Sequence, residues 1–176
     1  MGKSALFNRI IGRTAAIVYD TPGVTRDRLY VRASWAGRSF VLIDTGGLMS
    51  SAAKLPADMA EAAMAEVSAT DLPFAIERQA AAGISEATVI VMVCDGQEGP
   101  TVADEEVIAW LRRTHADKRV VLAVNKCESE KQGDVLASQF WGFGHEPFAV
   151  SAISGSGTGD LMDQILVVRS SCLASS

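Results

Sequence analysis

Three residues near the start of the chain, Gly2, Lys3 and Ser4, have the types and the order that phosphate-binding loops require. They match the closing half of the pattern G-x-x-x-x-G-K-[ST], in which a glycine lets the backbone approach a phosphate closely. Lys3 would bridge the terminal phosphates of a nucleoside triphosphate, and the Ser4 hydroxyl would ligate Mg²⁺. Apolar residues then recur at helical spacing, so the glycine turn leads into a helix whose first amides, near Ala5, would face the anion. Three common residues also occur together by chance at ordinary helix starts.

Two further loops carry oxygen atoms suited to the same metal ion. Residues 20–28, with sequence DTPGVTRDR, include Thr25, whose hydroxyl can reach a Mg²⁺ ion held by a γ-phosphate. Asp44, at the end of an apolar run, can hold Mg²⁺ through water, and the amide of Gly47 can touch the γ-phosphate. Singly, each is also explained as an ordinary connecting loop or a strand-ending turn. Together they predict a metal site and a catalytic set; the metal ligands are Ser4, Thr25 and Asp44, and the catalytic residues are Lys3, Thr25 and Gly47.

A fourth segment, Asn125, Lys126, Cys127 and Glu128, is close to the N-K-x-D element that reads guanine. In that element the carboxylate accepts hydrogen bonds from the ring N1 and the exocyclic amine, the asparagine holds the ring edge, and the lysine stem packs on the base plane. Glu128 stands where aspartate is expected, which moves the carboxylate by about one bond, so guanine selectivity requires the loop to adjust.

The last of these segments, Ser151, Ala152 and Ile153, follows an apolar run and precedes a helical pattern. A backbone amide near Ala152 could bind guanine O6. A Ser/Gly loop that caps a helix explains the composition equally well. The five segments nevertheless occur in the order that a nucleotide site needs, which favours a common function.

Short apolar runs that alternate with helical patterns predict βαβ units, and therefore an α/β fold with a mostly parallel sheet flanked by helices. The turn at residues 35–38 would join the first two strands into one antiparallel hairpin. We expect strands at residues 28–33, 39–43, 88–94, 120–124 and 147–150, and helices at residues 3–11, much of 57–82, 101–113, 132–140 and 157–167.

Composition limits the remaining possibilities. With 176 residues, of which 48% are hydrophobic, the chain suits one domain, expected over residues 1–168, followed by a tail or linker at 169–176. A net charge of −5 argues against a broad basic face for nucleic acid, so no direct DNA binding is expected, while a local patch could still contact RNA. The three cysteines lie far apart and form no zinc-ligand spacing, which favours a reducing compartment. No apolar run approaches the ~20 residues that span a bilayer, so no membrane partner is expected.

These motifs resemble a Ras-like P-loop GTPase domain and, more narrowly, the first GTPase domain of the Der/EngA family of tandem GTPases that act in ribosome assembly. The run DTPGVTRDR is the most diagnostic, and NKCES at 125–129 is similar to cyanobacterial and plastid members, which favours the cytoplasm or the plastid stroma. The segments that carry the resemblance are residues 2–9, 20–28, 44–48, 95–97, and Ser151 with 155–160.

The resemblance implies an enzyme that binds GTP and GDP with Mg²⁺, hydrolyses GTP slowly, and associates with the large ribosomal subunit in a GTP-dependent way. It also suggests K⁺ as a second cation in catalysis. In this class a hydrophobic residue, here Leu48, stands where other Ras-like proteins place a water-orienting glutamine. Catalysis would then rest on Mg²⁺, Lys3, switch closure and K⁺, while Arg26 is better explained by a salt bridge in the switch loop.

Complete members of the family have a central strand and the first half of the phosphate loop before the position of Met1, and a second GTPase domain and a KH-like domain after Ser176. The resemblance therefore predicts a GTPase domain that is incomplete at its N-terminus, with low stability and weak GTP binding. A non-catalytic guanine-nucleotide-binding module, such as a truncated product without turnover, is the alternative. An ATPase is a third reading, which Asn125 with Lys126 and Ser151 with Ala152 disfavour.

Overall fold

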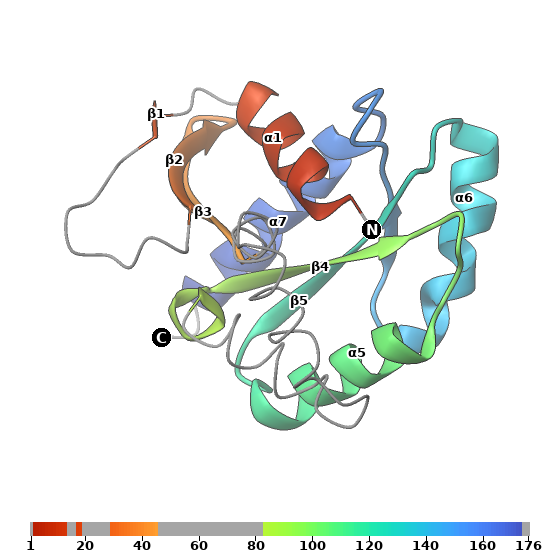
Figure 1. Ribbon diagram of the computed structural model, residues 1–176. Coiled ribbons are helices and arrows are strands. Elements are labelled where there is room, and N and C mark those ends of the chain that lie inside the picture. The colour runs from red at the N-terminus through yellow and green to blue at the C-terminus, as the bar shows by residue number, and fades with distance from the viewer. Residues whose placement is uncertain (1, 14–16, 19–28, 46–82, 174–176) are drawn as a thin grey trace, which may run out of the picture. The chain divides into compact units, whose positions relative to one another are not determined.

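The computed structural model describes residues 2–13, 17–18, 29–45 and 83–173 (Figure 1). They belong to two compact units, one formed by residues 1–13 and 87–176 and the other by residues 14–86. We call these the first and the second unit and describe each by itself.

The first unit is built on a parallel sheet of three strands, in the order β4 (Val89–Asp95), β5 (Arg119–Asn125) and β6 (Pro147–Ala149). The middle strand, β5, has four consecutive apolar residues that are almost fully buried, from Val121 to Val124. Such a run without alternation is what a strand covered on both faces requires. The parallel register pairs Asp95 with Asn125, so both polar residues lie at the carboxyl edge of the sheet.

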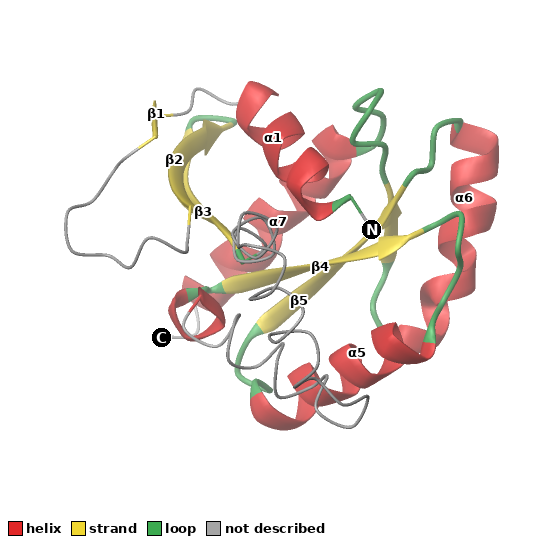
Figure 2. Cartoon of the chain, viewed as in Figure 1, coloured by secondary structure: helices red, strands yellow, loops and turns green. Residues whose placement is uncertain are grey.

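Helices flank this sheet, as Figure 2 shows by colour. In Figure 1, α1 (Lys3–Arg13) and α5 (Val102–Thr114) lie on opposite sides of β4 and β5. The last helix, α7 (Thr158–Leu173), contacts β4 and β5, while α6 (Glu130–Ser138) contacts β6 and the 3-10 helix η1 (Gln139–Phe143). The apolar face of α1 buries Leu6, Phe7 and Ile10.

Local capping explains where α5 and α6 begin. The Thr101 hydroxyl accepts a hydrogen bond from the Asp104 amide at 3.2 Å, and the Asp104 carboxylate accepts one from the Thr101 amide at 3.1 Å. This reciprocal capping box satisfies two amides that the first turn leaves without helical acceptors. The Ser129 hydroxyl likewise accepts from the Gln132 amide at the start of α6.

The second unit contains an antiparallel sheet of three strands, in the order β1 (Ile17–Val18), β2 (Leu29–Trp35) and β3 (Arg38–Asp44). Ala36 and Gly37 join β2 to β3 and both have positive φ, at 48° and 75°. Two such residues form the turn whose twist matches that of a hairpin. Residues 83–86 are helical, and the Tyr30 hydroxyl donates to the Glu86 carboxylate across 3.2 Å.

Each strand predicted from the sequence is present within two residues of its expected ends, and the hairpin turn falls where it was expected. Hydrogen bonds among the described residues form two separate sheets, and the short strand β1 was not predicted. The helix expected within residues 57–82 lies outside the described residues. No helix among the residues that the structure describes is long and apolar enough to cross a membrane.

Two predicted helix boundaries were wrong. The helix expected from residue 132 begins at Glu130, because Ser129 caps it, and gives way at Gln139 to the 3-10 helix. The last helix, expected to end at residue 167, continues to Leu173. Its small polar residues suit a helix since the Ser170 hydroxyl donates to the Leu166 carbonyl at 2.8 Å, one turn earlier.

Candidate functional site

The candidate site lies at the carboxyl edge of the parallel sheet, where the loops after β4, β5 and β6 meet the start of α1. Open α/β sheets place their ligands at this edge. Three of the five motif segments belong to this unit and can be compared directly: the Gly2 turn, the Asn125 segment and the Ser151 segment. The contacts between them are made largely by one buried side chain.

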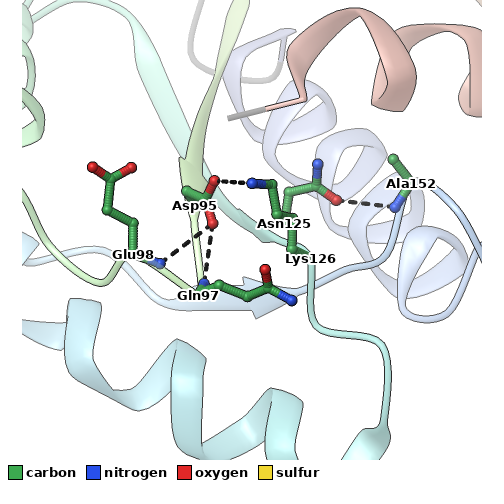
Figure 3. A network of polar contacts seen from close by, with 6 residues as sticks. All are labelled: Asp95, Gln97, Glu98, Asn125, Lys126 and Ala152. Atoms are coloured by element: carbon green, nitrogen blue, oxygen red, sulfur yellow. Dashed lines mark hydrogen bonds and ion pairs between the residues drawn. The ribbon is translucent and has the colours of Figure 1, made fainter.

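That side chain is Asn125, which is 2% exposed. Its Oδ1 accepts a hydrogen bond from the Ala152 amide at 2.9 Å, as Figure 3 shows. Its Nδ2 lies against Gly2, where an added Cβ would come within 2.5 Å of that nitrogen. Gly2 also has a φ of +76°, which favours glycine. Asn125 therefore joins the phosphate-loop glycine, the end of β5 and the loop after β6.

Lys126 is held beside this centre by Asp95, the last residue of β4. Its Nζ lies 2.5 Å from Asp95 Oδ2, and the carboxylate is 8% exposed (Figure 3). The second oxygen, Asp95 Oδ1, accepts from the amides of Gln97 at 3.1 Å and Glu98 at 3.4 Å. Burial opposes ionisation, but a set of hydrogen bonds, of which the one from Lys126 is the strongest and which includes the two amides, outweighs it and lowers the pKa of Asp95 to about 2. Asp95 is thus a charged, buried anchor for the lysine.

The backbone around Asp95 is packed tightly against the end of β5. The Gly96 amide donates to the Asn125 carbonyl at 2.8 Å. A Cβ on Gly96 would come within 3.0 Å of both that oxygen and a Val124 methyl carbon, so no side chain fits there without a shift. In the sequence alone, Asp95 and Gly96 indicate a family resemblance and no specific role. The signal that could have assigned them is an acidic residue followed by glycine at the end of the strand next to β5.

The loop after β6, residues 151–157, closes on itself through several hydrogen bonds. The Ser151 amide donates to the Ser156 carbonyl at 2.9 Å, and the Gly155 amide donates to the Ser151 carbonyl at 2.7 Å. The Ser151 hydroxyl accepts from the Ser154 amide at 3.1 Å and is fully buried with its residue. The adjoining Ile153 side chain is 72% exposed. These hydrogen bonds therefore hold the loop in a defined conformation, with the Ile153 side chain exposed.

A cavity of about 310 Å³ lies between α1 and this loop. Its volume is at the lower end of the range for small-molecule sites, roughly 300 to 1,000 Å³. It brings together two predicted binding residues from opposite ends of the chain. The lining residues are Ala5, Asn8, Arg9, Gly12, Arg13 and Ala152.

The other predicted residues are placed as follows. Gly2, Ser4, Ala5 and Glu128 are exposed, and Lys3 is half-buried near the start of α1. Asp44, 7% exposed, ends β3 in the second unit. Thr25 and Gly47 lie outside the described residues, as do Arg26 and Leu48.

The metal and thiol chemistry of the described residues is limited. They contain no group of three or more His, Cys, Asp or Glu side chains that could hold a metal ion. The Ser4 hydroxyl in the first unit and the Asp44 carboxylate in the second are each hard oxygen donors, the ligand type that Mg²⁺ prefers. Burial and the nearby Asp104 carboxylate raise the pKa of Cys94 to about 12, so this thiol is not a nucleophile.

Comparisons with known proteins show the family of the chain. Residues 1–126 match the family model described as 50S ribosome-binding GTPase. The chain is 51% identical over 167 residues to GTPase Der of Acaryochloris marina and 48% identical over 169 residues to GTPase Der of Prochlorococcus marinus. These alignments cover 94% and 96% of this chain, but the chain spans only 33% of the length of each of these curated relatives.

Solved structures show the same fold. Era in complex with MgGDPNP and a segment of 16S ribosomal RNA has a TM-score of 0.60 at 22% identity, covering 95% of this chain and 52% of that one. A probable GTP-binding protein engB has a TM-score of 0.50 at 24% identity, covering 97% of this chain and 93% of that one. At these identities the likeness concerns the fold, and it confirms the predicted Ras-like α/β architecture.

Proposed function

The chain belongs to the 50S ribosome-binding GTPase family, and on that premise we propose that it is a GTP-binding and GTP-hydrolysing switch that acts in biogenesis of the large ribosomal subunit. Its similarity to cyanobacterial Der proteins confirms the Der/EngA resemblance predicted from its motifs. Family membership implies guanine-nucleotide binding, while hydrolysis by this chain, its metal ions and its ribosomal partner are the proposal.

The observation that carries the proposal is the junction at Asn125. A single buried amide contacts the glycine of the phosphate loop and the amide of the loop that would read the base. A nucleotide has its phosphates and its base at opposite ends, so a site for it must hold two such loops at a set separation. Asn125 does this from a third element, the end of β5.

The roles of the individual residues follow from their chemistry. Lys3 and the first amides of α1 would bind the terminal phosphates, and Ser4 would ligate Mg²⁺. Lys126, anchored by Asp95, offers a 41% exposed side chain whose stem can cover the base plane. Glu128 is exposed beside it and would accept from the guanine N1 and exocyclic amine.

Base reading by the loop after β6 involves the peptide groups of Ala152 and Ile153. The Ala152 amide, the group predicted to bind guanine O6, donates to Asn125 Oδ1 in the described structure. Binding O6 would therefore require that amide to be shared, or the next amide along, that of Ile153, to take the contact. We propose that Ser151, Ala152 and Ile153 act together in this role.

For hydrolysis we propose Lys3, Thr25 and Gly47 around the γ-phosphate, with Ser4, Thr25 and Asp44 as the Mg²⁺ ligands. When bound, Mg²⁺ would neutralise charge that develops on the phosphate oxygens. K⁺ is proposed as a second cation that increases turnover. Leu48 offers no proton acceptor, so these residues would act by binding and positioning rather than as a general base.

Nucleotide binding and phosphate release test the function in two steps. The 176-residue chain should bind a fluorescent GDP that excess GTP displaces and ATP does not. Phosphate release from GTP should then be measurable with Mg²⁺ and faster with K⁺, and Lys3→Ala should abolish it. Binding without phosphate release would favour the non-catalytic module instead, and displacement by ATP would favour the ATPase reading.

Guanine selectivity can be assigned to Glu128 with a second nucleotide. IDP lacks the exocyclic amine of GDP, so the wild-type chain should bind GDP about 10-fold more tightly, since such a contact is worth ~1 to 2 kcal/mol. Glu128→Ala should remove this preference, and Glu128→Asp should keep it. Equal GDP and IDP affinities in the wild-type chain would contradict a role for Glu128 in base recognition.

The proposed partner is the large ribosomal subunit, and the proposed location is the cytoplasm or the plastid stroma. Co-sedimentation of the chain with purified large subunits in GTP, but not in GDP, would support the partner. Because the chain spans one third of its curated relatives, the same test with a full-length relative is the control for contacts made by the rest of those proteins.

A further inference from the structure

Arg9, on the second turn of α1, forms hydrogen bonds with the loop after β6. Its Nε donates to the Ala152 carbonyl at 2.7 Å, and its Nη2 donates to the Ile153 carbonyl. The two partners lie more than 140 positions away in the sequence. None of the five nucleotide-binding motifs assigns Arg9 a role, and neither does the function proposed above.

The paired contact determines which way a peptide group points. A guanidinium is a planar fork of donors, so it binds two neighbouring oxygens in one fixed orientation. The chain has no cis peptide bonds in its described residues. In a trans peptide the N–H points opposite to the C=O. With the Ala152 carbonyl directed at Arg9, the Ile153 N–H must therefore point away from α1.

A second arginine, one helical turn further along, supports the same loop. Arg13 Nη2 lies 2.5 Å from the position where a Cβ would stand on Gly155, so the guanidinium rests against that glycine. Gly155 has a φ of +85°, a conformation that glycine adopts most readily. Arg9 and Arg13 also line the cavity that Ala5 and Ala152 share. One face of α1 thus supports the loop at two points.

We propose that Arg9 is a positioning residue for base recognition, which aims the Ile153 amide at guanine O6 by holding the two carbonyls beside it. The inference rests on the proposed function, because it requires a guanine nucleotide in this site. It also links the two halves of the site: α1 binds phosphate at its N-terminus and sets the base-reading loop from its second turn.

The test compares two nucleotides that differ at the atom in question. GDP carries O6, whereas 6-thioguanosine diphosphate has sulfur, a weak acceptor, in its place and keeps both N1–H and the exocyclic amine. The wild-type chain should bind GDP about 3- to 10-fold more tightly, the value of one net hydrogen bond. Arg9→Met keeps the apolar stem and should reduce this preference to less than about twofold. It should do so by weakening the binding of GDP while leaving the affinity for the analogue unchanged.

Two further variants separate positioning from general damage. Arg113→Met removes an exposed arginine from α5, away from the loop, and should keep the full preference. Arg9→Lys replaces the fork with a single point donor, so it should restore part of the preference. Thermal unfolding of each variant shows whether it is folded, and Arg9→Lys carries the test if Arg9→Met does not fold.

The outcomes are distinct. If the wild-type chain does not distinguish GDP from the analogue, recognition of O6 fails and the proposed base-reading role of the loop fails with it. A clear wild-type preference that survives in Arg9→Met would overturn the inference about Arg9 alone. If Arg9→Met weakens the binding of GDP and of the analogue equally, the role of Arg9 is purely structural, and this result would also overturn the inference.

Discussion

Replacing Asp95 with asparagine should destabilise the folded chain in a way that depends on pH. The substitution keeps the shape of the side chain and removes its charge, so Lys126 loses the carboxylate that lies 2.5 Å from its Nζ. The loss should matter because the carboxylate is 8% exposed, and solvent screens it far less than a surface pair.

The magnitude follows from the pKa of the carboxyl group. Burial would raise this pKa, but hydrogen bonds to the carboxylate, the strongest from Lys126, lower it from an ordinary value of 3.8 to about 2. Because each tenfold change in an ionisation constant is worth about 1.4 kcal/mol, the charged form contributes at most about 2 kcal/mol to the free energy of unfolding. We expect Asp95→Asn to cost about 1 to 2 kcal/mol at pH 7, where the wild-type group is ionised.

The direction of the pH dependence follows from the lowered pKa. A carboxyl group with a lower pKa in the folded state stabilises that state above the unfolded pKa of 3.8, and the contribution disappears as pH falls towards 2. The stability difference between wild type and Asp95→Asn should therefore be constant from pH 7 to about 5. It should then shrink to about half near pH 3.

Urea unfolding of both chains between pH 3 and pH 7 measures this difference. Asp117→Asn is the matched control, because that carboxylate is 73% exposed and lies 3.7 Å from Lys118 in a surface pair. It should leave stability unchanged at every pH. A stability difference for Asp95→Asn that is absent at pH 7, or that is the same at pH 3 as at pH 7, would refute the reasoning.

Three further predictions concern packing and reactivity. Gly157→Ala should lower the free energy of unfolding by about 3 kcal/mol or prevent folding, because its φ is +68° and a Cβ would overlap the Ala149 carbonyl; a urea midpoint like that of wild type would contradict this. Ala36→Asn should raise the melting temperature, with a gain of about 0.5 to 1 kcal/mol, since asparagine tolerates a φ of 48° better than alanine; a lower melting temperature would count against it. Cys94 and Cys127 are buried and both have a raised pKa, so neither should react with a thiol reagent in the folded chain at pH 8, while both should react in urea; fast labelling of either in the native state would contradict the burial.

Much of the fold was predictable because its signals are local. Apolar runs such as residues 121–124 are buried on both faces of a sheet, and the pattern predicts this without any tertiary information. The hairpin turn and the capping box of Thr101 with Asp104 likewise involve residues next to each other in the chain. Boundaries were less predictable, since Ser129 and Ser170 are compatible with either a loop or a helix until their hydroxyl partners are known.

The amino-acid sequence by itself determined which residues could bind a nucleotide, because glycine, lysine and asparagine recur in motifs whose chemistry depends on residue type and order. It did not determine which of them meet. The contacts of Gly2 with Asn125, of Asp95 with Lys126 and of Arg9 with Ala152 join residues far apart in the chain. Only the parallel register of the strands and the packing of α1 bring them together, since a contact between distant residues depends on the path of the whole backbone between them.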